Sequence, residues 1–178
     1  MSLFKNCGLF WNADDVYFGR QGGRGVNRGA LRGVAEKMPS VEVDFRDQIG
    51  IYALYADFDL VYVGQVGAGD GQRLLARLRQ HSQKDFKGRW NRFSWFGLRS
   101  VLAGGELSNE NTAFHPSRAQ VLNHIEGIIL QFAEPALNGQ EGKFCGEVAR
   151  YRQIRDARLG KRPYDMLQAL YKDKFPTG

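Results

Sequence analysis

The chain has 178 residues, of which 43% are apolar and 12% aromatic, and its 25 Lys and Arg against 19 Asp and Glu give a formal charge of +6. This length suits one domain with extensions, and the apolar content is sufficient for a packed core. No stretch approaches the roughly 18 consecutive apolar residues of a membrane-spanning helix, so we expect no membrane partner.

The cysteine pattern and the first residues indicate a cytoplasmic protein. Cys7 and Cys145 are far apart and have no zinc-type spacing, which favours two free thiols in a reducing compartment over a disulfide. The first residues lack the long apolar run of a secretory signal.

Basic residues fall in three separated segments, a distribution that favours a polyanionic partner. Residues 20–32 hold four arginines and no acid, and residues 84–99 hold five basic residues against Asp85. Residues 141–178 hold nine basic and five acidic residues. With a pI near 9.5, such segments suit a surface that follows a phosphate backbone, although many basic surfaces are merely well solvated.

The first 47 residues give few structural signals. Residues 9–18 supply a short strand or an aromatic anchor. Residues 19–29 contain too much glycine for a stable helix, so the four-residue spacing of Arg20, Arg24 and Arg28 does not indicate a helical stripe. This segment is either a flexible loop or an arm that contacts phosphates.

Residues 48–133 predict an α+β arrangement. Residues 50–56 and 60–66 are β-type runs joined by three residues, which predicts a hairpin. A helix is expected over 72–83, a third strand over 92–99, a polar loop over 103–116 and a helix over 116–133 that ends before Pro135. The expected fold is a small three-stranded antiparallel sheet flanked by helices.

The chain is therefore expected to have three parts. These are an N-terminal extension (1–47), a catalytic domain (48–140) and a basic C-terminal extension (141–178) with helices over 148–159 and 164–174.

Glu126 is an acidic residue at an apolar position of the helix expected over 116–133. On a helical wheel, Leu122 and Ile129 lie within about 60° of it, so its carboxylate is expected within a buried patch. Burying an unpaired carboxylate is costly. Glu126 is therefore either paired with an arginine or a ligand of a divalent cation.

The helix over 72–83 carries a basic row. Arg73, Arg77 and His81 are four residues apart, and Lys84 lies close to them. The row is either a solvated face or a guanidinium site for a scissile phosphate. Other motifs are weaker: residues 64–71 lack the Gly-Lys-Ser/Thr ending of a P-loop, and His115 and His124 are isolated, which favours surface or capping roles.

Several motifs in order resemble the GIY-YIG nuclease family. Gly50-Ile51-Tyr52 and Tyr62-Val63-Gly64, with nine residues between the two tyrosines, resemble its paired signature, with valine in place of the commoner isoleucine. Arg77-Leu78 with His81 looks like its arginine helix, and Phe93-Ser94-Trp95 looks like its third strand. Glu126 looks like its metal-binding glutamate, and Pro135-Ala136-Leu137-Asn138 looks like its Pro-x-Leu-Asn turn. The resemblance covers roughly residues 48–140.

This resemblance implies a one-metal phosphodiester hydrolase with Glu126 as the ligand of Mg²⁺ or Mn²⁺. Tyr52 would activate the attacking water and Arg77 would stabilise the phosphorane-like transition state. Tyr62 and His81 would position water and substrate, and Asn138 would orient the site. Products would carry 5′-phosphate and 3′-hydroxyl ends.

DNA is the expected substrate, and cleavage of both strands would need a homodimer or two successive events. Branched, damaged or RNA substrates are the first alternative, and a non-catalytic nucleic-acid-binding module that retains the fold is the second. The expected nucleic-acid contacts are Arg20, Arg24, Arg28, Arg73, Lys84 and Arg89.

Overall fold

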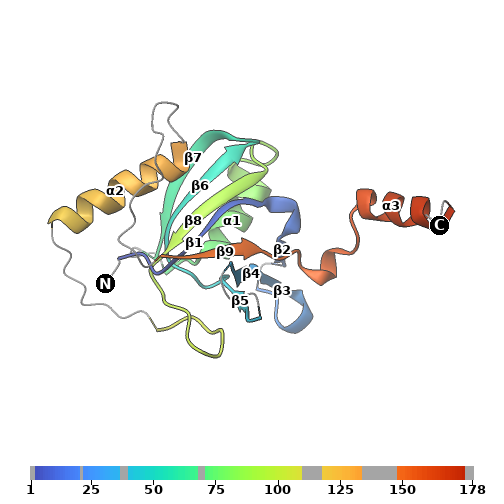
Figure 1. Cartoon of the computed structure of the whole chain (residues 1–178), viewed down its shortest axis with the longest axis horizontal. Helices are drawn as coiled ribbons and strands as arrows, with labels where there is room; N and C mark the ends of the chain where they lie inside the picture. The colour runs from blue at the N-terminus through green and yellow to red at the C-terminus, as the bar shows by residue number, and fades with distance from the viewer. Residues whose placement is uncertain are drawn as a thin grey trace.

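The computed structural model describes residues 3–20, 22–36, 40–67, 71–109, 118–133 and 148–174. These residues form a mixed seven-stranded sheet, a separate two-stranded sheet and three α-helices (Figure 1). In the large sheet the strand order is β5-β4-β9-β1-β8-β6-β7, and β1 and β9 are its parallel pair. The strands are β1 (Asn6–Asn12), β2 (Tyr17–Gly19), β3 (Arg28–Ala30), β4 (Arg32–Ala35), β5 (Glu42–Asp44), β6 (Gly50–Ala56), β7 (Asp59–Val66), β8 (Arg92–Gly97) and β9 (Ala149–Gln153).

The predicted hairpin and third strand are confirmed as β6, β7 and β8. Tyr52 on β6 lies opposite Gly64 on β7 and opposite Trp95 on β8. Gly50 begins β6 with a φ of 144°, and a Cβ at this position would lie 2.0 Å from the carbonyl oxygen of Phe96. Only glycine fits here, because any side chain would collide with the neighbouring strand.

The prediction of a small three-stranded antiparallel sheet is wrong. Both chain ends add strands to the sheet: β1 pairs with β8, and β9 lies between β1 and β4. The C-terminal strand β9 is short and carries little hydrophobic pattern, as it reads Ala-Arg-Tyr-Arg-Gln and buries only Tyr151. Backbone hydrogen bonding to strands distant in sequence, rather than side-chain periodicity, decides its conformation.

The same cause overturns the helix predicted over 148–159. This segment forms β9 followed by a single 3-10 turn at Ala157–Leu159. The other predicted helices are confirmed in type: α1 spans Leu74–Gln80 and continues as a π-helical turn over His81–Asp85, α2 spans Arg118–Ala133, and α3 spans Pro163–Lys174. None of the described helices is long and apolar enough to cross a membrane.

The two faces of the large sheet carry separate hydrophobic cores. One core contains Tyr52 and Trp95 together with Leu74, Leu75 and Leu78 of α1. The opposite core contains Ala53, Phe96 and Phe132, the last from α2. Because successive side chains of a strand point to opposite faces, α1 and α2 cover opposite sides of the sheet (Figure 1).

Helix α2 presents a different side to the sheet from the one expected. His124 is buried, accepts a hydrogen bond from the backbone of Leu3 at 3.2 Å and contacts the ring of Phe4, while Phe132 packs on Phe96. Leu122 and Ile129, which were expected in a buried patch, are 67% and 54% exposed. Apolar residues lie nearly all round this helix, so its sequence does not select the buried side.

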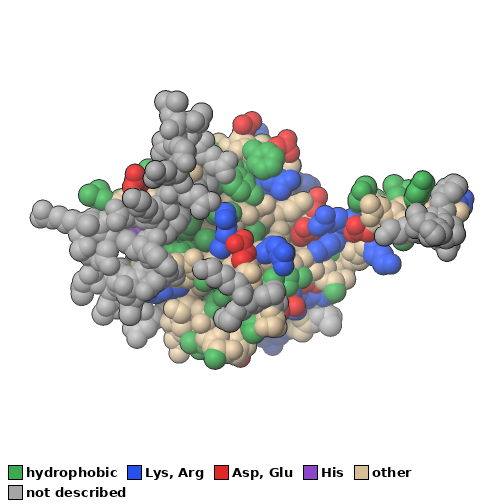
Figure 2. Space-filling view, in the orientation of Figure 1, with side chains coloured by type: hydrophobic (Ala, Val, Ile, Leu, Met, Phe, Trp, Pro, Cys, Tyr) green, Lys and Arg blue, Asp and Glu red, His purple; other side chains and the backbone are tan. Residues whose placement is uncertain are grey.

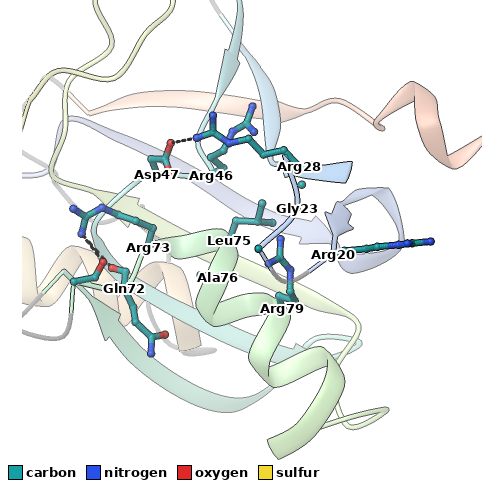
Figure 3. Close-up of a pocket in the computed structure, with 13 residues that line it drawn as sticks. Arg20, Gly23, Arg28, Arg46, Asp47, Gln72, Arg73, Leu75, Ala76 and Arg79 are labelled. Carbon is teal, nitrogen blue, oxygen red and sulfur yellow. Dashed lines mark hydrogen bonds and ion pairs between the residues drawn. The ribbon is translucent and has the colours of Figure 1, made fainter. Parts of the chain in front are cut away.

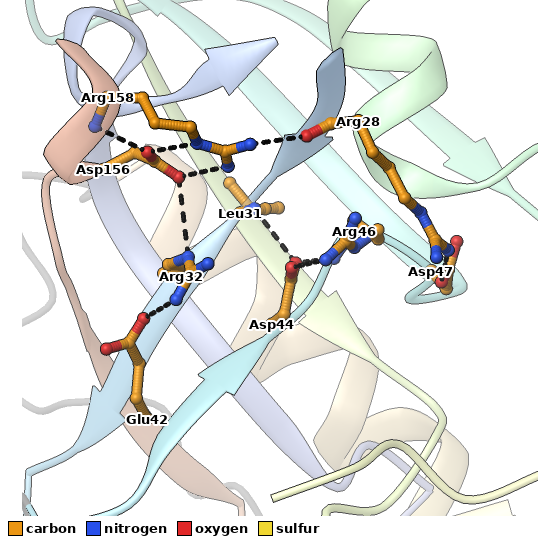
Figure 4. Close-up of polar contacts among 9 residues, drawn as sticks. All are labelled: Arg28, Leu31, Arg32, Glu42, Asp44, Arg46, Asp47, Asp156 and Arg158. Carbon is orange, nitrogen blue, oxygen red and sulfur yellow. Dashed lines mark hydrogen bonds and ion pairs between the residues drawn. The ribbon is translucent and has the colours of Figure 1, made fainter. Parts of the chain in front are cut away.

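Arginine–carboxylate contacts tie the C-terminal segment to the N-terminal strands (Figure 4). Asp156 is 3% exposed, accepts hydrogen bonds from Arg158 at 2.6 and 2.8 Å, and lies 3.5 Å from Arg32 of β4. Arg32 also pairs with Glu42 of β5. The hydrogen bonds from Arg158 are the main reason that the pKa of Asp156 is lowered. These contacts support the insertion of β9 into the sheet.

Candidate active site

Tyr52 and His81 form a hydrogen-bonded pair between the sheet and the end of α1. The Tyr52 hydroxyl lies 2.8 Å from Nε2 of His81. Tyr52 has no exposed surface, and His81 is 3% exposed. The phenol and imidazole, 29 residues apart in the chain, are therefore held in a fixed geometry within a buried environment, where such a bond is stronger than in water.

An aromatic cluster surrounds this pair. The ring of Tyr62 on β7 lies 5.0 Å from that of His81, and Phe86 stacks on His81 with centroids 5.0 Å apart and an interplanar angle of 30°. Tyr62 and Phe86 are themselves 5.0 Å apart. Tyr62 is half-buried, so it lies between the buried pair and solvent.

Gly64 is a functional position that the motif contains but sequence reasoning did not assign a role. A Cβ on Gly64 would lie 2.5 Å from the Tyr52 hydroxyl and 2.7 Å from Cε1 of Tyr62. The absence of a side chain therefore leaves the space that the Tyr52 phenol occupies over β7. Phe86 was also missed, because only the π-helical turn after α1 places its ring on His81.

Arg77 approaches the cluster from α1. It is half-buried, and its Nη1 donates a hydrogen bond to Oε1 of Gln80 at 3.1 Å. His81 follows Arg77 by one helical turn, and the His81 backbone N–H bonds to the Arg77 carbonyl. Arg77 and His81 are thus one turn apart and lie on the same side of the helix.

Glu126 is not brought to this cluster. It is exposed on α2, which packs through His124 and Phe132 on the sheet face opposite to that of Tyr52. Asn138 lies outside the described residues. The structure therefore unites four of the six expected catalytic residues and separates the expected metal ligand from them.

The described residues around Tyr52 do not fit a divalent cation. Within the described part of the chain, no three His, Cys, Asp or Glu side chains are grouped in a way that could hold a metal ion. Hard cations such as Mg²⁺ and Mn²⁺ need oxygen ligands, usually with at least one carboxylate. We therefore derive no chemical step through a metal.

Three of the expected nucleic-acid contacts lie beside α1, with the Arg20 side chain extending away from the other two (Figure 3). Arg20, Arg28 and Arg73 line one hollow, together with Arg46 and Arg79, which sequence reasoning missed (Figure 3). Lys84 lines a second hollow next to it. Arg24 and Arg89 are exposed and line neither hollow.

Comparison with protein-family models, curated proteins and solved structures finds no match to this chain. Function therefore has to be inferred from the geometry of these side chains.

Proposed function

We propose that the chain is a nucleic-acid phosphodiester hydrolase of the GIY-YIG type, with DNA as its preferred substrate. The observation that carries the proposal is the Tyr52–His81 hydrogen bond of 2.8 Å, formed by two residues of the motif that are separated in sequence. Tyr62 covers the pair, Arg77 adjoins it and Gly64 makes room for it. A phenol, an imidazole and a guanidinium together suit proton transfer at a phosphate ester.

The proposed chemistry divides the cluster into two layers. Tyr62 and Arg77, both half-buried, face the substrate. Arg77 neutralises the charge that grows on the phosphate oxygens, and the Tyr62 hydroxyl orients the attacking water. With the His81 proton on Nδ1, the Tyr52 hydroxyl donates to Nε2. As the water oxygen bonds to phosphorus, its proton passes through Tyr62 and Tyr52 to Nε2, and the departing 3′-oxygen takes a proton from solvent as its bond to phosphorus breaks.

Cleavage of a supercoiled plasmid tests the proposal directly. The parent protein and Tyr52→Phe and Arg77→Ala variants are incubated with Mg²⁺ or Mn²⁺ and with EDTA. Removing the phenol is expected to slow cleavage by about 10²-fold or more, and removing the guanidinium by about 10²–10³-fold. Tyr164→Phe on the exposed face of α3 is the matched control for the tyrosine and is expected to cleave at the parent rate.

End mapping on a long DNA of known sequence then defines the reaction. Products with 5′-phosphate and 3′-hydroxyl ends support the proposed hydrolysis, and recurring ends indicate sequence recognition. An RNA and a branched DNA in the same assay separate the alternative substrates. A parent protein that cleaves none of these substrates with any metal would refute the hydrolase.

The placement of Glu126 favours a second candidate, a nucleic-acid-binding module that does not hydrolyse its ligand. A binding module has no need of a carboxylate beside the phosphate, and Glu126 is exposed on the opposite side of the sheet. Salt-sensitive binding of DNA by the parent protein, without strand cleavage in the plasmid assay, would support this candidate over the hydrolase.

A further inference from the structure

Three segments distant in sequence enclose an arginine-rich hollow of about 410 Å³, which we call the arginine groove (Figure 3). The hairpin of β2 and β3 forms one wall, the link after β5 a second, and the start of α1 the floor. Its charged lining residues, among those described, are Arg20, Arg28, Arg46, Asp47, Arg73 and Arg79. The hairpin belongs to residues 1–47, outside the part of the chain that resembles the nuclease family.

The arginine groove carries a large excess of positive charge. Its described lining has five arginines and one acid, Asp47, which pairs with Arg28 at 3.3 Å in an exposed contact. Arg46 of the lining pairs with Asp44, which lies outside it. Among the described residues, the guanidinium groups of Arg20 and Arg79 form no ion pair. By contrast, Figure 2 shows basic and acidic side chains interspersed across another face of the molecule.

The positive charge of Arg79 is partly desolvated by burial, which is energetically unfavourable. Its Nε donates to the carbonyl oxygen of Phe18 at 2.7 Å, which fixes the guanidinium between α1 and the hairpin. Burial lowers the pKa of Arg79, and the contact that orients it is a neutral carbonyl. A bound anion would offset the desolvation of this charge, and guanidinium groups match phosphate oxygens in geometry.

The described lining offers no surface on which bases could stack. Among the residues that the structure describes, no aromatic side chain lines the arginine groove, and the non-arginine ones are glycines, one glutamine, one aspartate and two small or aliphatic residues. Proteins that hold single strands by their bases do so by stacking them on aromatic rings. Arginines without such rings suit the phosphodiester backbone, whose contacts position a nucleic acid without reading its sequence.

The arginine groove adjoins a second hollow that extends along α1 as far as Lys84. This hollow measures about 300 Å³ and shares Gln72, Ala76 and Arg79 with the first. Its lining includes Gln80, whose Oε1 accepts the hydrogen bond from Arg77 at 3.1 Å. A chain of polar side chains along α1 therefore connects the arginine groove to the guanidinium that we place at the scissile phosphate.

We propose that the arginine groove holds the phosphodiester backbone of one nucleic-acid strand, independently of sequence, and directs the next part of that strand along α1 to Arg77. The inference rests on the proposed function in taking nucleic acid as the ligand and Arg77 as the residue at the scissile phosphate. The hairpin of β2 and β3 is then a substrate-positioning element.

Binding to a fluorescent single-stranded DNA, measured by anisotropy in EDTA over a series of salt concentrations, tests this without any need for cleavage. Arg20→Ala and Arg73→Ala are compared with Arg152→Ala, an exposed arginine of β9 on the opposite face from α1. Each groove variant is expected to lower the slope of log K against log salt by about 0.7, the value for one lost phosphate contact on a single strand. Arg152→Ala is expected to keep the parent slope.

Two further arms identify the ligand. An RNA strand and a second DNA of unrelated sequence are expected to bind with the same dependence on Arg20 and Arg73, and inorganic phosphate is expected not to compete at millimolar concentration. Groove variants that bind like the parent, an equal loss in Arg152→Ala, a dependence on base sequence, or competition by inorganic phosphate would each overturn the proposal. A parent protein that binds DNA through the arginine groove but cleaves no substrate would count against the hydrolase and not against the groove.

Discussion

Replacing Gly64 with alanine is the sharpest structural test of the Tyr52–His81 pair. The new Cβ would lie 2.5 Å from the Tyr52 hydroxyl, 2.6 Å from Cζ of the same ring and 2.7 Å from Cε1 of Tyr62. Each distance is well below ordinary van der Waals contact. Tyr52 is fully buried and bonded to His81, so its ring cannot move aside without loss of the 2.8 Å hydrogen bond.

The expected magnitude combines two opposing effects. Overpacking a buried site costs about 1–3 kcal/mol, and three contacts this short favour the upper half of that range. Replacing glycine by alanine within a strand returns about 0.5–1 kcal/mol through backbone entropy. We therefore expect Gly64→Ala to lower the free energy of unfolding by about 2 kcal/mol, which corresponds to roughly 4–8 °C in Tm for a chain of this size.

Thermal and urea unfolding measure this change, with Gly104→Ala as the control. A Cβ on Gly104 would meet only the flexible carboxylate of Glu106, so little change is expected there. The cost of Gly64→Ala should also shrink in a Tyr52→Phe background, because one of the three close atoms is gone. A Gly64→Ala protein as stable and as active as the parent would refute the assigned packing.

Three further predictions follow from individual groups. Asp156→Asn should lower the free energy of unfolding at pH 7 by about 2 kcal/mol through loss of the charge-assisted hydrogen bonds from Arg158. Because the pKa of Asp156 is lowered in the folded state, the carboxylate stabilises the fold above about pH 4 and this contribution is lost as the pH falls further. Urea unfolding of the variant should therefore depend less on acid pH than that of the parent. Burial raises the pKa of Cys7 to about 12, so the folded protein keeps a proton that the unfolded chain loses above about pH 8.5. The free energy of unfolding should therefore fall from about pH 8.5 toward pH 12. In a Cys145→Ser background, the Cys7 thiol should react with a maleimide at pH 8 only after urea is added. Glu126→Gln should change unfolding free energy by less than about 0.5 kcal/mol, because Glu126 is exposed on α2.

Each of these has a contrary outcome with a clear meaning. An Asp156→Asn protein with the parent's acid dependence would place the native carboxylate outside the arginine contacts. Rapid labelling of Cys7 in the folded protein would contradict its burial under the sheet. If Glu126→Gln abolished metal-dependent cleavage while leaving stability unchanged, α2 would have to bring its carboxylate to the Tyr52 face in the active protein.

The separation of Glu126 from the tyrosines shows where motif reasoning reaches its limit. A motif predicts that residues occur in order, but it carries no information on which side of a sheet a following helix packs. The buried side of α2 is decided by two contacts, His124 with Phe4 and Phe132 with Phe96. Phe4 and Phe96 lie far from α2 in the sequence, so the sequence of the helix does not reveal these contacts. The apolar residues left exposed, Leu122 and Ile129, are equally suited to burial by composition.

The arginines, by contrast, were predicted from separate segments and are brought to one hollow by the fold. Arg20, Arg28 and Arg73 were predicted as phosphate contacts from two separate segments, and the fold places them in one hollow. Arg46 and Arg79 also line it but were not singled out from the sequence: Arg46 lies between Asp44 and Asp47, and Arg79 lies outside the four-residue row of Arg73, Arg77 and His81. Charge segments in a sequence indicate a class of partner, whereas only the packing of the β2–β3 hairpin against α1 makes a groove.

The sequence by itself determined the local elements with long, regular patterns: the hairpin of β6 and β7, the leucine face of α1, and the strand β8 that pairs with β6. The opposition of Tyr52 to Gly64 was decided in the folded hairpin, whose register shifts at a bulge between Leu54 and Tyr55. The tertiary structure alone decided that a charged five-residue segment at the C-terminal end becomes β9 between β1 and β4, and that α2 covers the face opposite Tyr52. The physical reason is that short or uniformly apolar segments have no preferred periodicity, so their conformation and orientation follow from hydrogen bonds and packing with residues far away in the chain.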